Sequence, residues 1–126
     1  MSKKNEQEKD KFVECIIKGI QEKKGKDIIS INLSKLDNAV CRYFIICHGD
    51  SNTQVNAIAH SIEKMMEDTL EEKTWRSQGY ENAQWVLLDY FDYVVHVFQK
   101  DTREFYNLES LWADGTVQFH NEVLVN

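Results

Sequence analysis

Cysteine and histidine side chains occur close together in the middle of the sequence, where their types could bind a metal. Cys47 and His48 are adjacent, and Cys41, His60 and His96 add further side chains of the kind that bind zinc. The spacing does not fit a zinc site, because the sequence contains neither a Cys-x-x-Cys nor a His-x-x-x-His pair. We therefore expect buried thiols and capping or surface histidines rather than a metal centre.

Three other groupings could support catalysis. Cys47, His96 and Asp89 are the residue types of a nucleophilic triad, but nothing in the sequence brings them together. Asp89 and Asp92 could hold a divalent cation only with further oxygen ligands that the sequence does not identify. The turn at residues 49–51 lacks the lysine and extra glycines of a phosphate-binding loop. The sequence therefore predicts no catalytic motif.

Length and composition predict a single soluble domain. The chain has 126 residues, of which 42% are hydrophobic, which is enough for one core and too much for a disordered chain. No apolar run is long enough to span a bilayer, and the polar start at residues 1–11 does not resemble a secretory signal. Three cysteines, an odd number, favour reduced thiols. We expect a cytoplasmic protein without a membrane segment.

The charge balance bears on the class of partner. The chain carries 15 lysine and arginine residues against 21 aspartate and glutamate residues, a formal net charge of −6. Nucleic-acid binding draws much of its energy from basic side chains that displace counterions, so we do not expect a DNA-binding surface. A basic protein is the partner that this charge favours.

The hydrophobic pattern predicts alternating helices and strands. Helical spacing indicates a helix over about 5–24, a second over about 51–73 that begins at a Ser51–Gln54 capping box, and a third that Asp101 and Glu104 could cap and that extends to Trp112. Strands are expected at 27–33, 43–47, 75–77, 85–89 and 93–99. This order predicts an α/β domain with a mixed sheet flanked by helices over residues 12–114, preceded by a polar extension at 1–11. The tail at 115–126 is either a final strand, since Val117 and Phe119 alternate, or a loose end, and the pattern does not choose between them.

The two strands at 85–89 and 93–99 are close enough to form a hairpin. A two-residue turn at Phe91–Asp92 opposes Trp85 with Phe98, Leu87 with His96 and Asp89 with Val94, which sorts one aliphatic face from one mixed face. A three-residue turn would bury Asp89 among valines at a high desolvation cost, so the two-residue turn is preferred. The mixed face fits either a docking surface or a face covered by the rest of the chain, and composition does not choose between them.

Longer stretches of the sequence resemble a known family. The signature WVLLDYFDYVVHVF at 85–98 and REFYNLESLW at 103–112, with YFIIC at 43–47 and the helix start that follows it, is similar to the ribosomal silencing factor family, also called Iojap-like. The resemblance covers about residues 12–114. It departs from the family at Phe91, where the family commonly has glycine in the hairpin turn, and a positive φ at a phenylalanine would cost about 1–2 kcal/mol.

The resemblance implies a function that needs no chemistry. Members of this family dock on the large ribosomal subunit, chiefly on large-subunit ribosomal protein fourteen, and obstruct joining of the small subunit when nutrients are short. Their fold is related to nucleotidyltransferases but has no working transfer site, so neither an enzymatic activity nor a cofactor is expected. The leading alternative is a nucleotidyltransferase-like enzyme that uses Asp89 and Asp92 with a divalent cation.

The mixed hairpin face is the predicted docking surface. Large apolar anchors beside a carboxylate suit a basic protein partner. The predicted contacts are Trp85, Leu87, Asp89, His96 and Phe98, with Tyr80 and Glu81 at the rim, and Phe91 could extend the patch at the hairpin tip. The same face could alternatively be buried in a homodimer.

Overall fold

A six-stranded mixed sheet organises the protein, which the computed structural model describes over residues 10–123. The strands lie in the order β3-β4-β5-β2-β1-β6, with β2 parallel to β5 and every other neighbouring pair antiparallel. The strands are β1 (Lys26–Asn32), β2 (Tyr43–Gly49), β3 (Arg76–Gln78), β4 (Trp85–Asp89), β5 (Tyr93–Gln99) and β6 (Thr116–Phe119). The α/β class and the mixed sheet expected from the sequence are confirmed.

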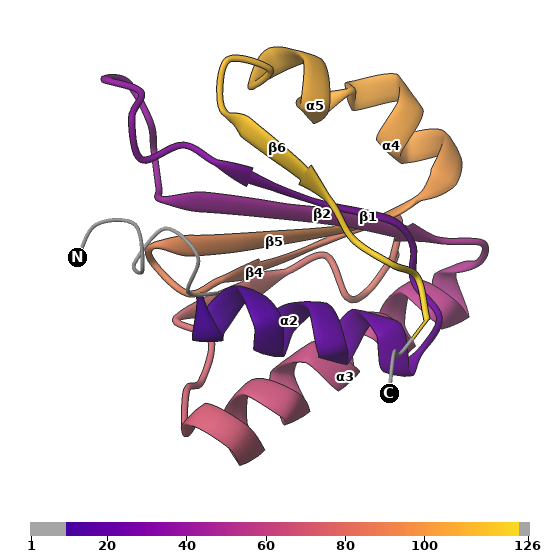
Figure 1. Ribbon diagram of the computed structural model, residues 1–126. Coiled ribbons are helices and arrows are strands. Elements are labelled where there is room, and N and C mark those ends of the chain that lie inside the picture. Colours follow the sequence, from indigo (N-terminus) through magenta and orange to yellow (C-terminus); the bar gives the residue numbers. More distant parts are fainter. Residues whose placement is uncertain (1–9, 124–126) are drawn as a thin grey trace.

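The helices lie on both faces of this sheet (Figure 1). The helices α2 (Lys11–Glu22) and α3 (Asn52–Leu70) cover one face, and the short helices α4 (Lys100–Tyr106) and α5 (Leu108–Leu111) lie on the other. Central strand β2 is buried on both sides because Ile45 and Cys47 pack toward α2 and α3, whereas Phe44 and Ile46 belong to the second core. Its unbroken apolar run is typical of a strand covered on both faces.

The two long helices pack closely and are joined to the sheet by polar contacts. A Cβ atom built on Gly19 of α2 would lie 2.8 Å from Cα of Ile62 in α3, so only glycine permits this approach. Asp10 caps α2 by accepting from the backbone N–H groups of Phe12 and Val13. Its second oxygen accepts from the Tyr93 hydroxyl at 2.6 Å, which fixes the start of α2 against β5.

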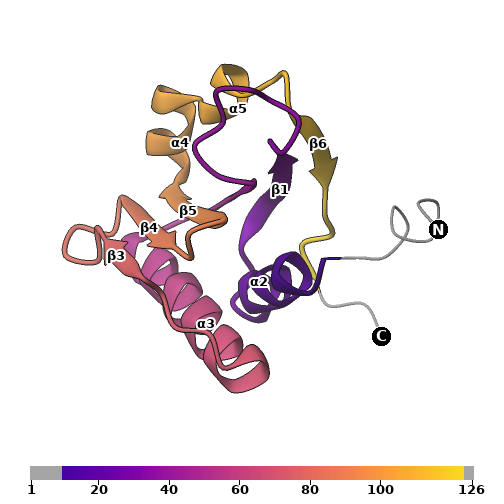
Figure 2. The ribbon, with the colours of Figure 1, turned by 90° about the vertical axis from the view of Figure 1, so that its left-hand side faces the viewer.

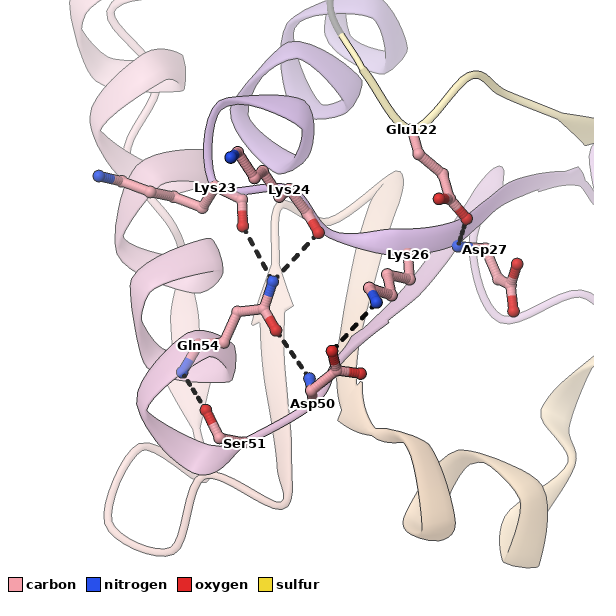
Figure 3. Close-up of polar contacts among 8 residues, drawn as sticks. All are labelled: Lys23, Lys24, Lys26, Asp27, Asp50, Ser51, Gln54 and Glu122. Carbon is pink, nitrogen blue, oxygen red and sulfur yellow. Dashed lines mark hydrogen bonds and ion pairs between the residues drawn. The ribbon is translucent and has the colours of Figure 1, made fainter.

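The predicted capping box at the start of α3 is half confirmed (Figure 3). The Gln54 N–H donates to Ser51 Oγ at 3.1 Å, as expected. The Gln54 side chain accepts from the N–H of Asp50 rather than that of Ser51, at 2.7 Å. Its amide nitrogen also donates to the carbonyls of Lys23 and Lys24, so this one side chain joins the start of α3 to the end of α2.

Three elements differ from the expected order. The first helix begins at Lys11, and residues 5–9 of the expected helix lie outside the described residues. The last expected helix is two helices, because Asn107 adopts a left-handed conformation (φ 50°) between α4 and α5, and Gln99 rather than Asp101 occupies the N-cap of α4. The tail, for which the sequence left a final strand and a loose end open, contributes the strand β6, which pairs with β1, so the folded unit continues past residue 114.

The hairpin adopts the predicted register. Trp85 lies opposite Phe98 and Asp89 opposite Val94, as expected for a two-residue turn. Within the turn the Asp92 N–H donates to the Tyr90 carbonyl at 3.0 Å, and Phe91 between them has φ 71°. This is the geometry of a γ-turn with a positive central φ, a strained conformation for a residue that has a Cβ atom. Phe91 therefore occupies the backbone conformation in which glycine is favoured.

A pair of substitutions separates this strain from the ring contact that Phe91 makes. The Phe91 ring lies 4.8 Å from that of Trp75, and both Phe91→Gly and Phe91→Ala remove this contact. We expect the glycine variant to be more stable than the alanine variant by about 1 kcal/mol, because only glycine is unstrained at this φ. Urea unfolding of both variants measures the difference. An alanine variant as stable as the glycine variant would show that the turn is unstrained.

Candidate functional site

Strand β4 presents a row of side chains on the sheet face opposite α2 and α3. Trp85, Leu87 and Asp89 are partly exposed, whereas Val86 and Leu88, which alternate with them, are fully buried against the helices. Figure 2 shows β4 and β5 with α3 on one side of the sheet and α4 and α5 on the other. The predicted mixed face therefore lies between the β3 edge of the sheet and the short helix α4.

The indole of Trp85 is fixed in place from several sides. Its Nε1–H group donates to Nδ1 of His96 at 3.1 Å. Its ring lies 4.9 Å from the Phe98 ring and 4.8 Å from the Tyr106 ring, centroid to centroid. A large side chain held in one orientation and still partly exposed is the kind of anchor that contributes most to protein interfaces, since little entropy is lost when it binds.

Burial keeps His96 uncharged. Desolvation lowers the pKa of His96 to about 4, so the ring is neutral at pH 7. Because Nδ1 accepts from Trp85, the proton of the neutral ring lies on Nε2, which is buried and has no hydrogen-bond partner among the described residues. The ring of Phe44 lies edge-on to the imidazole at 4.7 Å. His96 is thus a buried acceptor that orients the indole.

His96 and Phe98 support the surface rather than forming it. His96 is 4% exposed and Phe98 is 0% exposed, with Phe98 lying in the second core beside Phe44 and Ile46. This corrects the expectation that both side chains contact a partner directly. The pattern of the hairpin placed them on the right face, but helix α4 brings Tyr106 over the Trp85 end of that face.

Asp89 organises the hairpin tip while keeping part of its carboxylate at the surface. Oδ1 accepts from the N–H of Phe91 at 2.8 Å, and Oδ2 lies 3.9 Å from Nη2 of Arg76 on the neighbouring strand β3. Its side chain is 16% exposed. Asp89 therefore stabilises the γ-turn as well as contributing negative charge to the face, so its removal would affect both.

The two predicted rim residues lie in the turn between β3 and β4. Tyr80 packs toward α3, where its hydroxyl donates to Glu63 and its ring stacks on His60 at 4.5 Å. Burial, followed by the Glu63 contact, raises the pKa of Tyr80. Tyr80 therefore belongs to the helix side of the sheet, which corrects its assignment to the rim. Glu81 is exposed in the same turn.

Tyr106 is the surface residue that the residue-by-residue assignment missed. It is 52% exposed and lies against the indole of Trp85. The signal that could have found it is the match of residues 103–112 to the family signature, because that match includes Tyr106. Its position depends on the break at Asn107, which ends α4 directly after Tyr106, and the helical spacing of the segment did not reveal that break. We use the term docking surface for the surface predicted to bind a partner, which consists of Trp85, Leu87, Asp89 and Tyr106.

The alternative catalytic groupings do not assemble. Cys47 belongs to the core beneath α2 and α3, whereas His96 and Asp89 lie on the opposite face of the sheet. Complete burial raises the pKa of the Cys47 thiol to about 12, so it stays protonated at neutral pH. Among residues 10–123, no group of three or more His, Cys, Asp and Glu side chains has the arrangement to hold a metal ion. None of the helices in that range is long and apolar enough to cross a membrane.

Comparison with known proteins identifies the family. A family model described as "Ribosomal silencing factor during starvation" matches residues 6–124. The chain belongs to the ribosomal silencing factor family. Ribosomal silencing factor RsfS of Halalkalibacterium halodurans is 42% identical over 105 residues, which cover 82% of this chain and 87% of that protein.

Two further relatives of this ribosomal silencing factor family extend the comparison. A crystal structure of a protein from Chromobacterium violaceum aligns with a TM-score of 0.77 at 34% identity and covers 87% of this chain and 90% of that one. A mouse protein named "Mitochondrial assembly of ribosomal large subunit protein 1" is 24% identical over 103 residues, 80% of this chain and 45% of its own length. The proteins to which this chain is similar are therefore named for ribosomal silencing and, in the mouse protein, for assembly of the large ribosomal subunit.

Proposed function

We propose that this protein is a cytoplasmic, non-enzymatic factor that binds the large ribosomal subunit through large-subunit ribosomal protein fourteen. Membership in the ribosomal silencing factor family supports a ribosomal partner. The main support for placing the binding site on the docking surface is the fixed, partly exposed indole of Trp85 on the same face as the carboxylate of Asp89. An aromatic anchor next to a negative charge is suited to a basic protein partner.

The charge of the protein favours protein over RNA as the main contact. A net charge of −6 repels the phosphate backbone of ribosomal RNA, whereas a basic ribosomal protein would be attracted. The docking surface carries Asp89, whose Oδ2 lies 3.9 Å from Nη2 of Arg76. Binding should therefore weaken as salt rises, since part of the attraction is screened.

The proposed mechanism is steric. A specific interface buries about 800 Å² on each partner. The docking surface, with Trp85 at its centre and Leu87, Asp89 and Tyr106 around it, would form the central part of such an interface. The rest of the domain, including α2 and α3 on the opposite face of the sheet, would then project from the large subunit. Bound in this way, the protein occupies space that the small subunit must enter, and translation is lowered when nutrients are limiting.

Co-sedimentation tests this proposal. Purified large subunits are mixed with the protein, washed at increasing salt and pelleted, with small subunits as the control. We expect retention on large subunits only, and competition by purified ribosomal protein fourteen. Light scattering of the free protein at several concentrations checks for a homodimer on the same face, which would compete with docking. Equal retention on both subunits, or no effect of the purified ribosomal protein, would contradict the proposal.

A further inference from the structure

A cavity of about 560 Å³ opens at the end of the sheet where β2 and β5 finish. It is lined by residues from the bulged start of β1, the end of β2, the short helices α4 and α5, and the strand β6 with the residues after it. Its volume lies in the range of small-molecule sites in proteins, which is roughly 300–1,000 Å³. It shares no residue with the docking surface of Trp85, Leu87, Asp89 and Tyr106.

The cavity lies at the carboxyl end of β2, on the α4 side of the sheet, next to a position where open α/β sheets bind ligands. The neighbouring strands β2 and β5 are parallel, and the chain leaves them toward opposite faces of the sheet. After Gly49 it enters α3 on one face, and after Gln99 it enters α4 on the other (Figure 1). The crevice outside the carboxyl ends of such strands is the usual ligand site of open α/β sheets, because the diverging connections leave room between them.

A buried guanidinium lies in the wall of the cavity. Arg103 of α4 is 7% exposed, and its Nε–H donates to Oε2 of Glu109 at 2.9 Å. Its Nη1 group contacts Nδ1 of His48 at 2.9 Å and the carbonyl of Lys26 at 3.4 Å. Since arginine can only donate, Nδ1 of His48 accepts and this histidine is uncharged in the contact. The Nη2 group makes none of these contacts, so it can donate to a ligand carboxylate.

A carboxylate oxygen in the same wall lacks a partner. Oε2 of Glu109 accepts from Arg103, but Oε1 is buried and has no hydrogen-bond partner among the described residues. A buried carboxylate oxygen without a partner costs free energy, and a ligand ammonium group would remove that cost. The cavity wall thus offers an anion-binding donor and a cation-binding acceptor on two side chains that touch each other.

The rim of the cavity is mostly acidic. Four of its charged lining residues are carboxylates, and two, Lys100 and Arg103, are basic. Asp27, Glu104 and Glu122 are exposed at this rim, and Glu122 also accepts from the backbone N–H of Asp27 at 2.8 Å (Figure 3). Lys26 beside the rim pairs with Asp50 at 3.0 Å, so its charge is already balanced. An anionic ligand is therefore disfavoured overall, and a ligand with an added cationic group is favoured.

We propose that this cavity binds a free α-amino acid with a cationic side chain. The ligand carboxylate would lie against Arg103, its α-ammonium group against the free oxygen of Glu109, and its side-chain cation near the rim carboxylates Asp27 and Glu104. Each of the three charges on such a ligand meets a group of opposite sign in the cavity. A simple amine lacks the carboxylate that would pair with Arg103, and a simple acid lacks both cations. This site is independent of the proposed ribosome docking.

Thermal unfolding and calorimetric titration with defined ligands test the proposal. L-arginine and L-lysine are compared at constant ionic strength with agmatine, which lacks the α-carboxylate, and with L-glutamate, which reverses the side-chain charge. We expect saturable binding of L-arginine or L-lysine, with a rise in Tm of about 10 °C at ~100-fold excess over Kd. Agmatine and L-glutamate should bind at least about 10-fold more weakly, because each loses one charge pair.

Two variants connect the binding to the cavity. Glu109→Gln removes the charge that faces the ammonium group. Glu104→Gln removes a charge at the rim, and because this side chain is exposed, the Glu104→Gln variant should keep its fold even if the Glu109→Gln variant does not. We expect Glu104→Gln to weaken L-arginine while leaving the affinity for a neutral amino acid such as L-norvaline unchanged. Absence of saturable binding of either basic amino acid to the wild-type protein overturns the proposal, as does equal binding of agmatine or unchanged L-arginine affinity in Glu104→Gln.

Discussion

Replacing Trp85 with alanine should lower the affinity for large ribosomal subunits by about 30-fold or more. A truncated hot-spot residue costs at least about 2 kcal/mol of binding, and Trp85 has the features of one, being aromatic, partly exposed and held by His96 and Tyr106. The fold should survive, because Trp85 is only partly buried and lies outside the core beneath α2 and α3. Co-sedimentation titrations give the affinity, and circular dichroism reports the fold.

Trp75 provides a matched control for this substitution. It is the same residue type and is 56% exposed, but it lies beside Phe91 at the hairpin tip rather than against His96. We expect Trp75→Ala to change the affinity by less than about threefold. Equal losses in the two variants would mean that exposed aromatic area, rather than the Trp85 site, drives binding. A Trp85→Ala variant that is unfolded would place the indole in the core and refute the assignment.

Acidification should destabilise the protein through His96. Burial lowers the pKa of His96 to about 4 from an ordinary value near 6.5. Between pH 4 and pH 6.5, therefore, this imidazole is protonated in the unfolded chain but not in the folded chain. The free energy of unfolding should therefore fall as pH drops from 6.5 to 4, by about 3 kcal/mol from this residue. Above pH 6.5 both states leave it neutral, so the contribution of His96 to the pH dependence ends there.

Urea unfolding of the wild type and His96→Phe at pH 7 and pH 4.5 measures this contribution. His96→Phe keeps an apolar ring in the core and should reduce the pH dependence. A remainder is expected from His48, whose pKa is also lowered, chiefly by burial and next by Arg103. Identical pH dependence in the wild type and His96→Phe would show that the imidazole is not buried in solution.

The parts of the fold that sequence reasoning predicted are those that local patterns encode. The hairpin register followed from the alternation of residues 85–98 together with the cost of burying Asp89 among valines, and the structure has that register. The two-sided burial of β2 followed from its unbroken apolar run. In both elements the pattern and the tertiary environment agree, so the residues themselves carry enough information.

The parts that were missed depend on contacts between distant segments. Strand β6 is exposed at all four positions, so the alternation of Val117 and Phe119 marks no buried face, and a final strand and a loose end stayed equally open until its pairing with β1 was seen. The burial of Phe98 and His96 follows from how the chain returns after β5, because α4 carries Tyr106 back over Trp85 and α5 adds Leu108 to the second core. The left-handed turn at Asn107 that makes this possible has no strong local signal, since asparagine also occurs within helices.

Formation of whole ribosomes from separated subunits tests the central claim most directly. Large subunits are preincubated with the protein, small subunits are added, and the fraction of joined ribosomes is measured on a sucrose gradient. The wild-type protein should reduce that fraction in proportion to the large subunits it occupies, and Trp85→Ala at the same concentration should not. Large subunits that carry the wild-type protein and still join small subunits at full yield would contradict a steric block.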